Sequence, residues 1–170
     1  MEGESVTVQA LIGSVESLLQ QHEELLVLEE KKQLAIMKDD TNLLIELTNK
    51  ESRLVKQISE TEKRRVQSAR ALLDQLGIMS DPNPQVSDIV SYLTSANDKL
   101  KLTELTDRLV SILGQLKQLN ELNLRLAEQA LEFNHFSIEL LTGSFEQDFT
   151  YSKPDASSGK SKANLFDSKA

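Results

Sequence analysis

Apolar residues recur at intervals of three and four along nearly all of the first 142 positions of this sequence, with very few interruptions by glycine or proline. The 170 residues include only 6 Gly and 3 Pro, whereas an all-β chain needs such residues at its many turns. Spacing of three and four places side chains on one face of an α-helix. We therefore expect an all-α fold. Its core must consist mainly of Leu, Ile, Val and Ala, because aromatic residues make up only 4% of the chain.

Breaks in the pattern separate the predicted helices. The first covers about residues 5–38, and the motif Asp39-Asp40-Thr41 then supplies a break and an N-cap, because short oxygen-bearing side chains accept hydrogen bonds from free helix N–H groups. Gly77 stands where a left-handed cap would end the second helix. The motif SDPNP at residues 80–84 cannot continue a helix, so we expect a loop there.

The last part of the chain begins with Asn83 and Pro84, which suit the cap and first position of a short helix through Leu93. A final helix over about residues 95–142 is longer than either of the first two. Because short connections make neighbouring helices antiparallel, we expect an elongated antiparallel bundle of three long helices plus one short helix in residues 1–143. Residues 144–170 are small, polar and aperiodic, which is typical of a flexible, disordered C-terminal tail.

Charge and cysteine content limit the classes of partner. The chain carries 27 acidic and 19 basic residues, a net charge of −8, which disfavours binding to nucleic acid or anionic lipid. The basic motif Lys63-Arg64-Arg65 lies in a Glu-rich helix and is interpreted as a solvated face. There is no Cys, no signal-peptide pattern at the start and no apolar run of about 20 residues. We expect a cytoplasmic protein without membrane insertion.

No motif in the sequence indicates catalysis. His22-Glu23-Glu24 begins like the zinc motif H-E-x-x-H, but the second histidine is missing because position 26 is Leu. The stretch SSGKS at residues 157–161 ends like a phosphate-binding loop, but the earlier glycine is replaced by Pro154 and no strand precedes it. We expect no enzyme activity, no metal and no cofactor.

The final helix carries more than one apolar face. In a heptad frame with position a at Leu102, the d positions form an unbroken apolar seam: Leu105, Ile112, Leu119, Leu126, Phe133 and Leu140. The a positions change from leucine to small or polar residues at Asn123. From the same point an apolar b row continues with Leu124, Leu131 and Ile138. A soluble bundle needs one apolar stripe, so the second one predicts a covering partner.

A shallow strip lies between these rows: Asn120, Asn123, Ala127, Ala130, Asn134 and Ser137. Small side chains let another backbone come close, and amides can bond to it, so the strip suits an incoming amphipathic helix. Six of the seven aromatic residues follow position 132, which also favours a C-terminal binding region. The residues predicted to contact a client are Asn120, Asn123, Leu124, Ala127, Ala130, Leu131, Asn134 and Ile138.

The stretch LNELNLRLAEQALEFNHFSIELLTG, preceded by LLIELTNKESRLVKQISETEKRR, resembles the FlgN family of flagellar export chaperones over about residues 8–143. The resemblance implies a cytoplasmic chaperone that holds the C-terminal segment of hook-associated (hook–filament junction) proteins. It also implies that the chaperone prevents their premature assembly and delivers them to the type III export gate. In some members a Tyr after the last helix contacts the gate, and Tyr151 is the positional candidate for export-gate docking here.

Two other functions compete with an export chaperone. A structural coiled-coil protein could use the extra stripe to homodimerise through its last helix, and a metal-dependent or enzymatic helical domain is disfavoured by the missing ligand residues. The sequence leaves open which hook-associated protein is the client, the affinity and stoichiometry, and the oligomeric state of the free protein. It also leaves open whether the tail docks to the export gate or shields the client face.

Overall fold

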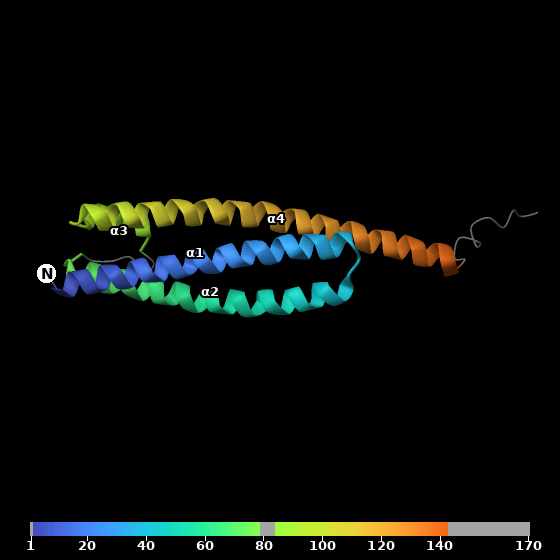
Figure 1. Ribbon diagram of the computed structural model, residues 1–170, viewed down its shortest axis with the longest axis horizontal. Coiled ribbons are helices and arrows are strands. Elements are labelled where there is room, and N and C mark those ends of the chain that lie inside the picture. Colours follow the sequence, from blue (N-terminus) through green and yellow to red (C-terminus); the bar gives the residue numbers. More distant parts are fainter. Residues whose placement is uncertain (1, 79–83, 143–170) are drawn as a thin grey trace, which may run out of the picture. The chain divides into compact units, whose positions relative to one another are not determined.

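The computed structural model describes residues 2–78 and 84–142 of the chain. It contains four helices, α1 (Glu2–Met37), α2 (Thr41–Gln75), α3 (Val86–Tyr92) and α4 (Ala96–Thr142), as Figure 1 shows. The described residues include no strand, so the predicted all-α class is confirmed. The predicted tail and Tyr151 lie outside the described residues. The chain divides into two compact units, Met1–Phe133 and Asn134–Ala170, and the second is described as far as Thr142.

The sequence correctly predicted the two caps of α2. The side chain of Asp40 accepts a hydrogen bond from the Leu43 N–H at 3.0 Å, which satisfies a free donor of the first turn. Gly77 has a φ of 69°, in the left-handed region that glycine adopts without steric cost. The predicted start of the short helix was wrong. Helix α3 begins at Val86 with Gln85 as a cap that forms no side-chain hydrogen bond, and Asn83 lies outside the described residues.

Helices α1 and α2 form an antiparallel pair. The Thr7 hydroxyl donates to Gln75 Oε1 at 2.7 Å, and the Lys32 ammonium donates to Glu51 Oε2 at 2.7 Å. The residue numbers therefore increase along α1 while the numbers of their partners in α2 decrease. The two helices lie side by side in Figure 1, and only residues 38–40 connect them.

Helix α4 runs in the same direction as α1. Lys101 pairs with Glu16 at 2.7 Å and Arg108 pairs with Glu23 at 2.9 Å, so both partners advance together. All four helices contribute to one buried apolar cluster: Val8, Leu11, Ile12, Val15, Leu19, Ala69, Leu72, Leu73, Ile89, Leu93, Leu102 and Leu105. A smaller cluster joins only α1 and α2: Leu28, Ala35, Leu47 and Leu54.

The short helix is held near α2 by an arginine that the sequence suggested was solvated. Arg65 is buried, donates twice to the carboxylate of Glu62 at 2.7 and 2.8 Å, and donates to the Pro84 carbonyl at 3.0 Å. That interpretation was wrong for Arg65, although Lys63 and Arg64 are exposed. A guanidinium has enough donors to satisfy a carboxylate and a backbone carbonyl together, which makes its burial tolerable.

The core seam of α4 stops earlier than the heptad pattern predicts. The buried residues of α4 are Leu102, Leu105, Leu116 and Asn123, while Phe133 is 68% exposed. Asn123 contacts Glu29 of α1, and α1 ends at Met37. Because both helices rise about 1.5 Å per residue, α1 ends about level with Leu131. The d-row residue Phe133 therefore has no turn of α1 opposite it.

Candidate functional site

The apolar b row of α4 is exposed, as the heptad pattern indicates. Leu124 is 61% exposed and Leu131 is 63% exposed, and both lie in the first compact unit. Within the second unit, Ile138 is also exposed. Exposed leucines on a regular helical spacing form an apolar surface that water solvates poorly. Such a surface is suited to being buried against a protein partner.

The residues of the shallow strip between the apolar rows of α4 differ in how far they are buried. Asn120 and Asn134 are exposed, whereas Ala127 and Ala130 are half-buried. Asn123 is only 4% exposed, and its amide faces α1 instead of solvent. The sequence suggested an exposed position for Asn123, and the structure instead buries its side chain inside the bundle.

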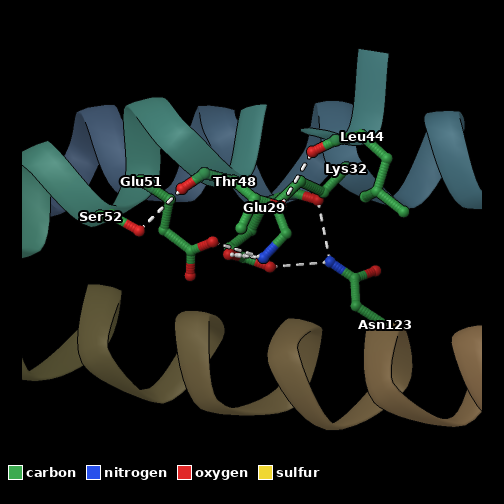
Figure 2. A network of polar contacts seen from close by, with 7 residues as sticks. All are labelled: Glu29, Lys32, Leu44, Thr48, Glu51, Ser52 and Asn123. Carbon is green, nitrogen blue, oxygen red and sulfur yellow. Dashed lines mark hydrogen bonds and ion pairs between the residues drawn. The ribbon is translucent and has the colours of Figure 1, made fainter. Parts of the chain in front are cut away.

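Figure 2 shows the polar network that holds Asn123. Its Nδ2 donates to the Glu29 backbone carbonyl at 3.0 Å and to Glu29 Oε2 at 2.9 Å. Lys32 donates to Glu29 Oε1 at 2.9 Å and to Glu51 Oε2 at 2.7 Å. The network thus joins α1, α2 and α4. Asn123 Oδ1 is buried without a hydrogen-bond partner, so the Asn123 side chain is held in this network through its amide nitrogen alone.

The charges of this network stabilise each other. Burial raises the pKa of the Glu29 carboxyl, but hydrogen bonds from Lys32 and Asn123 and the charge of Lys32 together hold that pKa below its ordinary value. Burial lowers the pKa of the Lys32 ammonium, while Glu29 and Glu51 raise it above its ordinary value overall. Both groups therefore stay charged at neutral pH, and neither is suited to exchange protons with a substrate.

The described residues contain no group of three or more His, Cys, Asp or Glu side chains that could hold a metal ion. His22 is half-buried, and its Nδ1 lies 2.7 Å from the Leu18 carbonyl oxygen, so the imidazole is engaged with its own helix. None of the helices in the described ranges is long and apolar enough to cross a membrane.

Sequence reasoning missed the first part of the exposed face. Val110 and Leu113 are both exposed on α4, at heptad positions b and e. They precede Asn123, where the a row changes to polar residues. The sequence prediction started the exposed face at that change and therefore did not include them. Counting positions b and e back along the helix would have found both.

Two comparisons with known proteins found a match. The model of the family described as "FlgN protein" matches residues 1–159. The chain is 33% identical over 167 residues to the "Uncharacterized protein YvyG" of Bacillus subtilis (strain 168), which covers 97% of this chain and 100% of that protein. No solved structure matches the chain.

Proposed function

This chain belongs to the FlgN family, and from that premise we propose that it is a cytoplasmic flagellar export chaperone for hook-associated proteins. The family supports a general role in flagellar export as a chaperone rather than an enzyme. The proposal adds that the client is the C-terminal helical segment of a hook–filament junction protein. Holding that segment would prevent premature assembly and keep the client ready for the export gate.

The exposed leucines of α4 are the observation that carries this proposal. Leu124 and Leu131 lie seven residues apart on one face, and both are more than half exposed. Covering a leucine fully contributes about 1.5–3 kcal/mol, so two of them supply a substantial part of the binding free energy of a short helix. Half-buried Ala127 lies between them and lets the client backbone approach closely. Asn120 adds an exposed amide that can bond to the client.

The part of α4 in the second unit provides further candidate contacts. Asn134 and Ile138 are exposed there. They continue the same residue types, an amide and a branched apolar side chain, and we assign them to the client surface as well. Asn123 is left out of this surface because it is buried against Glu29.

A double substitution tests the client surface. Leu124→Asp with Leu131→Asp should abolish binding of a client C-terminal peptide in titration calorimetry, because burying either carboxylate costs several kcal/mol. Circular dichroism should show unchanged helix content, since both positions are solvated in the free protein. The matched control is Ile45→Asp with Val55→Asp, two exposed apolar residues of α2, and it should leave binding intact. Loss of folding in the Leu124 and Leu131 variant would mean that these leucines belong to the core.

Homodimerisation through α4 is the competing function. It would give a mass in sedimentation equilibrium that rises with protein concentration and falls to the monomer in the Leu124→Asp, Leu131→Asp variant. A pull-down from cell extract separates the two functions. Retention of a hook-associated protein supports the chaperone, and self-association without a retained client supports the structural coiled coil.

Delivery to the export gate is assigned to the tail, which lies outside the described residues. Its sequence is rich in Ser, Lys and Gly, with Phe149 and Tyr151 early in this segment and Leu165 and Phe166 near its end. Short apolar motifs on a polar tether can present a bound client to a second partner at high effective concentration. Deleting residues 144–170, or Tyr151→Ala alone, should leave client affinity unchanged and reduce export. A several-fold gain in client affinity on deletion would instead mean that the tail shields the client face.

A further inference from the structure

A second heptad seam runs along α4 beside the one that packs into the bundle. We call it the outer seam, and it consists of positions b and e of the heptad frame: Val110, Leu113, Lys117, Asn120, Leu124, Ala127 and Leu131. All of them are exposed except Ala127, which is half-buried, and all lie in the first compact unit. The spacing alternates between three and four without a break. This is the repeat that a helix needs to pair with another helix along its length.

The start of the outer seam is set by α3. Thr103 and Thr106 are the b and e residues one heptad before Val110 and Leu113, and they line a cavity of about 230 Å³ with Ser87 and Val90 of α3. Helix α3 therefore borders this face of α4 at its first turns. From Val110 onward the face is open, and three heptads are free for a partner.

The two flanks of the outer seam differ in charge and in access. One flank is the a row, where Leu116 and Asn123 are buried against the bundle. The other flank is the f row, which carries exposed Asp107, Glu121 and Glu128. Among the residues that the structure describes, none forms an ion pair with Glu121 or Glu128. A helix lying on the outer seam thus meets carboxylates on its open side and the bundle on the other.

This charge pattern discriminates between occupants. In a coiled coil, the residues that flank the seam face the flanking residues of the partner, and opposite charges there select the partner. A second copy of this chain lying antiparallel would set Glu121 and Glu128 against their own equivalents. A parallel copy would bring them against a row that is already buried. Both arrangements are unfavourable, so the outer seam is poorly suited to self-association.

We infer that the outer seam binds one amphipathic helix of a different protein, with apolar residues at heptad spacing and with Lys or Arg along the flank that faces Glu121 and Glu128. The inference rests on the proposed function, because it specifies the chemistry of the helix held on α4. It also extends the bound length back to Val110 and Leu113. Lys117 is the charged member of the outer seam, so the partner carries a polar residue opposite it, which fixes the register of the pair.

Two synthetic peptides test the flank chemistry on the full chain. Both have four heptads with Leu at the a and d positions, and they differ only in carrying Lys or Glu at the e and g positions. The Lys peptide should bind at least about fivefold more tightly than the Glu peptide at low salt, and the preference should shrink as salt is raised. Glu121→Lys with Glu128→Lys should reverse the preference. The control Glu24→Lys with Glu60→Lys makes the same change in net charge at exposed sites of α1 and α2, and it should preserve the preference.

Three results would overturn the inference. The first is equal binding of the two peptides, and the second is a preference that the control variant changes as much as the α4 variant does. The third is a dimer of the free chain that Leu124→Asp dissociates.

The client peptide separates this inference from the proposed function. In one outcome, the client peptide binds to the native chain, fails to bind to the Leu124→Asp variant, and keeps its affinity when the charges of Glu121 and Glu128 are reversed. That result would support the chaperone function and contradict the flank chemistry. If the synthetic peptides obey the rule but the client peptide is not bound, the flank chemistry stands and the proposed function falls.

Discussion

Asn123 of α4 donates two hydrogen bonds to Glu29 of α1, one to its backbone carbonyl and one to its carboxylate, across a sequence separation of 94 residues. It is the last buried residue along the described part of α4. The pair therefore marks the last point along the described part of α4 at which a side chain is buried in the bundle.

We predict that Asn123→Ala destabilises the bundle by about 1.5–3 kcal/mol, the usual contribution of a hydrogen bond to a charged group. The buried Glu29 carboxylate loses a donor that water cannot readily replace. Urea unfolding followed by circular dichroism measures the change. Asn120→Ala, one turn earlier and exposed, is the control, and its stability should be unchanged or slightly higher because alanine favours helix. Equal effects at the two positions would contradict the assigned role of Asn123.

The stability of the bundle should also depend on pH through Glu29. Its pKa is lower in the folded chain than in the unfolded chain, so its contribution is fully present above about pH 4.3, the ordinary pKa of glutamate. That contribution is lost as the pH falls through the folded value. The difference in unfolding free energy between the native chain and Glu29→Gln should therefore be largest at neutral pH and shrink toward pH 3. Urea titrations at several pH values test this, and a difference that stays constant would refute it.

Arg65 should contribute to stability although it belongs to a basic motif. Arg65→Ala removes the bonds to Glu62 and to the Pro84 carbonyl, and we expect a loss of about 1.5–3 kcal/mol. Lys63→Ala, at an exposed position of the same motif, should change the unfolding free energy by less than about 0.5 kcal/mol. Thermal unfolding of both variants gives the comparison. If Arg65→Ala leaves thermal unfolding unchanged, the contact with Pro84 does not hold in solution.

The exposure of Phe133 leads to a further prediction about the core. Phe133→Ala should cost less than about 1 kcal/mol, because most of this side chain is already in contact with water. Leu102→Ala, at a fully buried position of the same helix, should cost about 2–5 kcal/mol. Melting temperatures of the two variants measure the contrast. A large loss for Phe133→Ala would show that the d seam is packed beyond the end of α1.

The sequence by itself determined the helices, two of their caps and the second apolar face of α4. Each of these depends on residues a few positions apart. Asp40 accepts from Leu43 within one turn, Gly77 relieves a local backbone conformation, and Leu124 and Leu131 are related by one heptad. Periodicity records such short-range relations directly.

Only the tertiary structure decided which side chains are buried, because burial depends on the segment of the chain that lies opposite each one. Asn123 looked like part of a binding strip, and it is buried because Glu29 of α1 lies beside it. Phe133 fits the heptad of the core, and it is exposed because α1 ends before reaching it. Arg65 looked solvated, and it is buried because the chain returns to it at Pro84. A heptad pattern gives the direction of a side chain around its own helix, but the length and offset of the neighbouring helices decide whether that direction leads to the core or to water.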